Sequence, residues 1–169
     1  MAQETPTLPA AIARLRAAID ADDAALGCVA AETLGRALNG NSPAAVAIDA
    51  GALPVLLAAA AAFGRSGEAS SALLHAATLF CNQRGFHEAD AEDAAFVRGY
   101  IPLAVRALDE HGAAQPRVLT DVAWLVATKL APFKAAWVAA GAIPALQRLM
   151  GAQADGGARL QQCIDKLAT

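Results

Sequence analysis

A seven-residue phrase occurs three times along this chain and constrains its fold more than any other feature. Each copy has a glycine followed three residues later by a proline, at Ile48–Pro54, Phe96–Pro102 and Val138–Pro144. The prolines are 48 and 42 residues apart, and Leu8-Pro9 forms a weaker copy 45 residues before the first. Repeats of this length are typical of stacked helical arrays, which present a surface and need not enclose a reaction pocket.

The composition favours helices and argues against nucleic-acid binding. Of the 169 residues, 56% are hydrophobic, and much of this share is alanine, the best helix former. No run of β-branched residues alternates with polar ones, so strands are not expected. The net charge of −3 and the pI of about 5.5 do not provide the broad basic face that phosphate backbones need. We therefore expect an all-α protein with no nucleic-acid partner.

The sequence shows no signal for secretion or for membrane insertion. Met1–Pro6 has neither the positive charge nor the apolar run of a signal peptide. The most apolar stretch, 44–63, contains Asp49, Gly51 and Pro54, which indicates two buried helices in place of a membrane span. We expect a cytoplasmic protein, with a nuclear location left open, and no membrane partner.

The cysteines and histidines give no sign of a metal or catalytic site. Cys28, Cys81 and Cys163 are 53 and 82 residues apart, which favours buried thiols in a reducing compartment over a metal site or a disulfide framework. His75 is expected to serve packing, and His87–Asp93 is expected to be a solvated acidic loop leading into a helix. Motifs of nucleophilic, phosphate-binding and zinc enzymes do not occur. We expect no enzyme activity, no cofactor and no metal.

Helix breakers divide the chain into units of a short, a medium and a long helix. Gly51, Gly99 and Gly141 are expected to end the short helices, and the prolines that follow them lie in first turns, where a missing N–H costs little. The expected short helices cover 43–49, 91–98 and 132–139. The expected medium helices cover 8–19, 52–63, 100–111 and 142–151. The expected long helices cover 24–38, 68–84, 114–130 and 156–168.

The resulting domain organisation is a flexible tail at 1–7 and one domain at 8–169. Its repeat units are expected at about 8–41, 42–88, 89–131 and 132–169, and the first of these lacks a short helix.

The phrases Ile48–Pro54 and Val138–Pro144 closely resemble the opening of an armadillo repeat. The resemblance covers nearly the whole chain, in about three and a half units, and is carried by the glycine–proline pairs. HEAT-like or degenerate repeats remain open for the unit that starts at Leu8. The resemblance implies a right-handed superhelix of α-helices whose long third helices line a concave groove for extended peptides.

Peptide-clamping members of that family use a tryptophan and, four residues later, an asparagine. The apolar stripes place this pair on Trp124 and Thr128 in the third unit. The other units have Leu74 and Thr78, Glu32 and Arg36, and Asp165 and Thr169 at these positions. Only Trp124 matches, and threonine cannot make the two-point contact of an amide. We therefore expect a mixed groove without a regular ladder of peptide contacts, lined by Trp124, Thr128, Leu74, Thr78, Glu32 and Arg36.

Trp124 is the main candidate for an anchor, and a half-buried core aromatic is its alternative. Trp137 is expected to pack between units. The preferred function is a protein-interaction module that presents the groove to a protein or peptide. The alternative is a structural subunit that contacts its neighbours through the solenoid ends and the convex face.

The two ends of the array raise a further expectation. The first helix carries Ile12, Leu15 and Ile19, and the last carries Leu160, Ile164 and Leu167. Either one apolar face of each terminal helix is exposed, or another surface covers it. End-to-end self-association or a larger assembly would provide that surface.

Overall fold

A computed structural model describes residues 7–39, 51–83, 90–152 and 157–169. Over these ranges the chain forms helices and no strand, which confirms the all-α prediction. The chain divides into two compact units, Met1–Arg84 and Gly85–Thr169. The expected short helix at 43–49 and nearly all of the expected tail at 1–7 lie outside the described residues.

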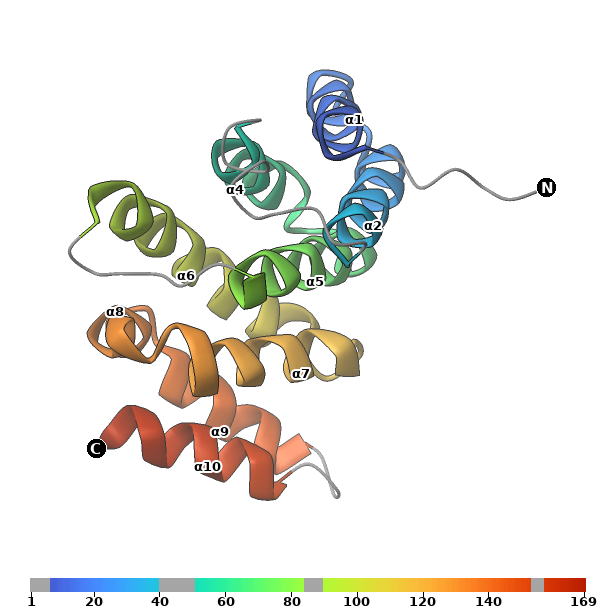
Figure 1. Cartoon of the computed structure of the whole chain (residues 1–169). Helices are drawn as coiled ribbons and strands as arrows, with labels where there is room; N and C mark the ends of the chain where they lie inside the picture. Colours follow the sequence, from blue (N-terminus) through green and yellow to red (C-terminus); the bar gives the residue numbers. More distant parts are fainter. Residues whose placement is uncertain (1–6, 40–50, 84–89, 153–156) are drawn as a thin grey trace. The chain divides into compact units, whose positions relative to one another are not determined.

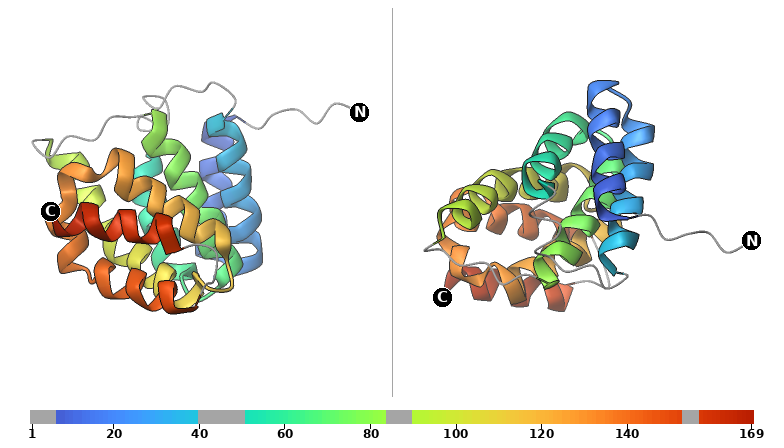
Figure 2. Two further views of the ribbon diagram at one scale, coloured as in Figure 1. Left: turned by 90° about the horizontal axis from the view of Figure 1, so that it is seen from below. Right: turned by 45° about the horizontal axis from the view of Figure 1, so that its top comes forward.

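The first unit consists of α1 (Leu8–Asp20), α2 (Ala24–Asn39), α4 (Ala52–Phe63) and α5 (Gly67–Gln83), coloured blue to green in Figure 1. Helix α2 packs along both α1 and α5, and α4 packs against α1 and α5 (Figure 2). Asp23 accepts the Leu26 N–H at 2.9 Å and so satisfies a donor in the first turn of α2. The core of this unit includes fully buried Leu15, Leu34, Leu38, Leu56 and Phe80.

The second unit begins with α6 (Ala91–His111) and α7 (Pro116–Trp124). A π-helical turn (Leu125–Lys129) and a 3₁₀ turn (Ala131–Phe133) connect α7 to α8 (Lys134–Ala139), and α9 (Ala142–Ala152) and α10 (Gly157–Ala168) follow. Helix α9 packs between α6 and α10 (Figure 2). The core includes fully buried Tyr100, Ile101, Leu108, Leu125 and Trp137.

Most helix bounds agree with the sequence prediction. The helix expected at 52–63 is confirmed with the same bounds. Helices α1, α2, α9 and α10 differ from their predicted bounds by one residue at one end, and α5 differs by one residue at each end. Gly51 and Gly141 adopt left-handed backbone conformations, with φ of 73° and 84°. Because side chains disfavour that conformation, glycine suits the point where α4 or α9 begins.

The prediction that Gly99 ends a short helix is wrong. One helix, α6, runs from Ala91 to His111 with Pro102 inside it, and Gly99 does not share the positive φ of Gly51 and Gly141. A glycine with an ordinary helical backbone is a poor helix former, but it does not by itself end a helix. Pro102 cannot donate to the Arg98 carbonyl, but both residues are exposed, so water can reach the carbonyl that remains.

The predicted long helix at 114–130 is also corrected. Regular α-helix ends at Trp124, and the chain continues as a π-helical turn in which the Leu130 N–H donates to the Leu125 carbonyl at 3.0 Å. The predicted helix at 132–139 begins as a 3₁₀ turn before α8. The turns therefore change the helical geometry next to Trp124.

Most of the apolar residues that the sequence places on the terminal helices are buried within the units. Ile12 and Leu15 in α1 are buried and Ile19 is half-buried, and Leu160, Ile164 and Leu167 in α10 are buried. The described large hydrophobic side chains that are exposed are Leu26, Val29 and Val138. End-to-end association stays a prediction.

Among the described residues, no single helix has both the length and the apolar character needed to cross a membrane. One pair of segments, Pro116–Lys129 with Ala131–Ala139, meets the length and composition requirement together but is bent by 93°.

Candidate functional site

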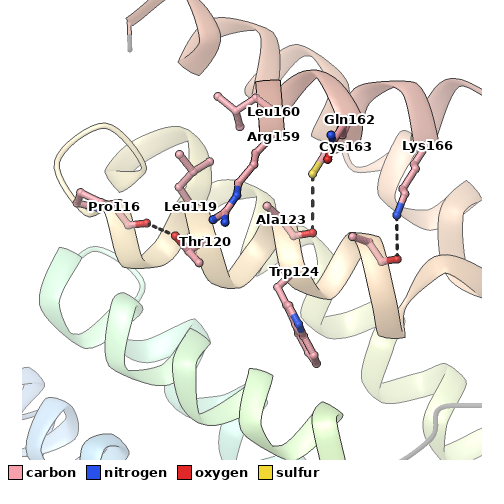
Figure 3. A pocket seen from close by; sticks show the side chains of 11 residues that line it. Pro116, Leu119, Thr120, Ala123, Trp124, Arg159, Leu160, Gln162, Cys163 and Lys166 are labelled. Atoms are coloured by element: carbon pink, nitrogen blue, oxygen red, sulfur yellow. Dashed lines mark hydrogen bonds between the residues drawn. The ribbon is translucent and has the colours of Figure 1, made fainter. Parts of the chain in front are cut away.

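A cleft of about 600 Å³ lies in the second unit, between α10 and the face formed by α7 with the π-helical turn (Figure 3). Leu119, Ala123, Ala127 and Leu160 supply its apolar surface, and Trp124 lies at one side. The remaining lining residues are Pro116, Thr120, Arg159, Gln162, Cys163 and Lys166. We call this feature the α7–α10 cleft.

The π-helical turn shapes the cleft and is held by a side chain from α10. Lys166 Nζ donates to the Ala127 carbonyl at 3.3 Å, across 39 residues of sequence (Figure 3). The Cys163 thiol lies 3.8 Å from the Ala123 carbonyl and donates to it. Both contacts join α10 to the segment that contains Trp124. Single π-turns of this kind are frequent at functional sites.

Cys163 is a structural group of the cleft. Its side chain is buried, and burial raises the pKa of the Cys163 thiol above its ordinary value, against the smaller opposing effect of the Lys166 charge. The thiol therefore stays protonated at neutral pH and can donate to Ala123. Because the thiolate is the nucleophilic form, this environment does not favour cysteine chemistry.

The charged side chains that are described in the lining of the cleft are all cationic. Arg159 and Lys166 bring two cationic side chains to it, and none of the described residues that line it is acidic. Both cations are exposed at their α10 positions. The cleft therefore joins an apolar surface to a cationic rim, within a chain whose net charge is −3.

Trp124 and Thr128 differ in their relation to the cleft. Trp124 is half-buried, lines the cleft, and directs its indole away from α10 (Figure 3). Thr128 is exposed, donates its hydroxyl to the Trp124 carbonyl at 2.8 Å, and is not among the lining residues. The structure thus pairs the two within one helical segment and brings only the tryptophan to the cleft.

The other four predicted groove residues lie in the first unit. Glu32 and Arg36 are exposed on α2, where Arg36 donates to the Thr33 hydroxyl at 3.3 Å. Leu74 and Thr78 on α5 are buried, and Thr78 donates its hydroxyl to the Leu74 carbonyl at 2.8 Å. A groove shared by all six residues stays a prediction.

The acidic stretch His87–Asp93 is described only from Asp90 onward. Asp90 accepts the Asp93 N–H at 3.0 Å, so it caps the start of α6 as the sequence indicates for an acid at a helix N-terminus. His75 is half-buried on α5. Among the described residues, no group of three or more His, Cys, Asp and Glu side chains is arranged to hold a metal ion.

A second cavity of about 300 Å³ adjoins the α7–α10 cleft, and sequence reasoning missed it. It shares Ala127 and Lys166 with the cleft and adds Lys134 and Trp137. We call it the lysine cavity. Trp137 was expected only to pack, and its side chain is indeed fully buried. No sequence signal joins Lys134 to Lys166, because α8 and α10 meet only in the folded chain.

Comparison of the chain with protein-family models, with curated proteins and with solved structures finds no match. The resemblance to armadillo repeats is therefore carried by the repeated phrase, and a function must be argued from the geometry of the site.

Proposed function

We propose that this chain is an armadillo-like helical repeat protein that acts as a protein-interaction module, with the α7–α10 cleft as its contact surface. The observation that carries the proposal is an apolar cleft of about 600 Å³ lined by a half-buried tryptophan. Tryptophan is enriched among residues that dominate binding energy, because it buries a large area with few rotatable bonds.

The repeat assignment is supported by two glycines in equivalent places. Gly51 precedes α4 and Gly141 precedes α9, and each has a left-handed backbone. In both cases the helix that follows contains the proline of the repeated phrase, and a longer helix, α5 or α10, comes after it. A right-handed superhelix is the arrangement that such repeats would form.

The cleft favours recognition of side chains over recognition of a peptide backbone. Thr120 lines the cleft and donates its hydroxyl to the Pro116 carbonyl at 3.1 Å. This hydroxyl donor is thus used within its own helix. A partner helix needs no backbone donors from the cleft because its backbone groups are already paired, and only its side chains must enter.

The experiment is affinity capture with wild type and with Trp124→Ala, followed by measurement of the affinity for the captured protein. We expect Trp124→Ala to weaken binding by about 30-fold, as for a residue that contributes 2 kcal/mol. Val138→Ala is the matched control, because Val138 is an exposed apolar residue of the same unit outside the cleft lining. Equal binding by wild type and Trp124→Ala would contradict the assignment of the cleft.

A second candidate function is supported by a different surface. Leu26 and Val29 are 41% and 57% exposed on α2, one helical turn apart. As a structural subunit, the chain would bury these two side chains against a neighbour. Loss of capture by Leu26→Ser with Val29→Ser, with capture retained by Trp124→Ala, would favour this second function.

A further inference from the structure

We propose that the partner segment carries a carboxylate side chain next to an apolar one, with the apolar group in the α7–α10 cleft and the carboxylate in the lysine cavity. This inference rests on the proposed function, since it names the chemistry of the partner at the same surface. The two cavities share Ala127 and Lys166, so adjacent groups of one ligand can occupy both.

The lysine cavity offers cationic donors. Lys134 is half-buried and Lys166 is exposed, and both line it. One of the three donors of Lys166 is used by the Ala127 carbonyl at 3.3 Å, which leaves two for a ligand. Among the described residues that line this cavity and the cleft, none has an acidic side chain. A carboxylate would therefore meet donors and no like-charged side chain from the described lining.

Trp137 provides an independent indication of an acceptor. Trp137 is one of the residues that line the lysine cavity, its side chain is fully buried, and its Nε1–H has no hydrogen-bond partner among the described residues. A buried donor without a partner costs about 1–3 kcal/mol. Since indole nitrogen can only donate, the group that would satisfy it must be an acceptor.

Two further polar residues bear on the chemistry of the ligand. Thr169 lines the lysine cavity, but its hydroxyl already donates to the Asp165 carbonyl at 3.0 Å, so that proton is not offered to a ligand. Arg159 lies on the cleft rim, so a second acidic residue of the partner would meet a cation there. The partner that fits best is an acidic amphipathic helix, because its backbone is paired and its side chains supply both the apolar and the anionic groups.

The test is a selection of random peptides, displayed on phage, against the full chain. We expect the selected peptides to combine a large apolar residue with Asp or Glu. Their affinity should fall about tenfold when Lys134→Gln and Lys166→Gln are combined, as for a lost charged hydrogen bond. Lys129→Gln is the matched control, because Lys129 lies on the π-helical turn outside the lining of both cavities. It should change affinity by less than about twofold.

The indole N–H resonances provide a direct readout at the site. The chain has two tryptophans, and Trp124→Phe identifies which cross-peak belongs to Trp137. Addition of a selected acidic peptide should move the Trp137 cross-peak downfield and saturably, and the same peptide with Asn or Gln in place of its acids should not. Sodium chloride at matched ionic strength is the control for screening.

The outcomes separate the inference from the proposed function. Selected peptides that lack acids, that bind the lysine double variant unchanged, or that leave the Trp137 cross-peak unmoved would overturn the inference. If their binding still requires Trp124, the proposed function stands. Peptides that bind Trp124→Ala as tightly as wild type, or a selection that yields no specific binder, would contradict both.

Discussion

At the scale of single residues, Gly27 lies where a side chain has no room. A Cβ added there would come within 2.5 Å of Phe63 Cε2 and 2.6 Å of Cδ2. Phe63 is buried, so its ring cannot move aside without disturbing the core. Gly35 on the same helix is different, because the nearest atoms would lie at 3.6 Å and 3.7 Å, in ordinary contact.

We predict opposite effects for these two glycines. Gly27→Ala should lower the free energy of unfolding by about 1–3 kcal/mol through overpacking. Gly35→Ala should raise it by about 0.5–1 kcal/mol, because alanine is the better helix former. Urea denaturation followed by circular dichroism measures both changes. Equal effects of the two substitutions would show that α2 and α4 do not meet closely at Gly27.

Cys163 is expected to make the free energy of unfolding depend on pH. Burial raises the pKa of the Cys163 thiol above its ordinary value of 9.0, so the folded chain keeps a proton that the unfolded chain loses. The protonated thiol therefore makes its full contribution to the free energy of unfolding below pH 9. This contribution is lost as the pH rises above 9, and the free energy of unfolding falls by at most about 1.4 kcal/mol per pH unit. As the pH rises above about 9, the free energy of unfolding should fall more steeply for wild type than for Cys163→Ala. Parallel curves would contradict this.

The candidate site could be predicted from the sequence only in part at this scale. Trp124 was identified because its place on an apolar helical stripe is local information. Lys166 was not, because it meets Ala127 across 39 residues. Trp137 was assigned to packing, which its burial confirms, but the unpartnered N–H could be found only with the neighbours in place.

At the scale of elements, Gly141 sets the start of α9. Its φ is 84°, and open space surrounds it except for Pro144 Cγ at 3.9 Å from an added Cβ. Gly141→Ala should therefore destabilise the fold by about 1–2 kcal/mol through backbone strain alone. Gly151→Ala is the matched control within α9, where an added Cβ meets nothing within 4 Å. It should stabilise by up to about 1 kcal/mol, and thermal denaturation would detect both changes. A stabilising Gly141→Ala would contradict the strained backbone.

The helix bounds were predictable where the breaker acts through its own backbone. Gly51 and Gly141 adopt the conformation that only glycine takes readily, and the helices after them begin as expected. Gly99 keeps a helical backbone within α6, because the surrounding residues Phe96, Val97, Tyr100 and Ile101 are all buried on one continuous helix. The π-helical turn was missed because its hydrogen-bond pattern leaves no signature in residue periodicity.

At the scale of the whole molecule, each unit has its own buried core and its own buried cysteine. Cys81 is fully buried in the first unit and Cys163 is buried in the second. Thiol labelling under native conditions reports on opening of the structure around each. Gly27→Ala strains the first unit, so Cys81 labelling should accelerate by about 5- to 100-fold, and more than Cys163 labelling does. A greater acceleration at Cys163 would show that the strain is not held in the first unit.

The fold class was predictable at this scale because it depends on composition and periodicity. Abundant alanine, glycine–proline breakers and the absence of alternating β-branched residues all favour helices, and the described chain contains only helices. The function was less predictable, since it depends on which helices meet. The cleft arises from α7 and α10, and its charge comes from Arg159 and Lys166, which no repeated phrase contains.

Hydrogen–deuterium exchange of the full chain, with and without the partner obtained by affinity capture, shows where the partner binds. We expect the partner to slow exchange in Pro116–Lys129 and in α10, which together form the α7–α10 cleft. We also expect α1 and the first half of α2 to exchange as before. Protection concentrated around Leu26 and Val29, with Pro116–Lys129 and α10 unchanged, would contradict the account.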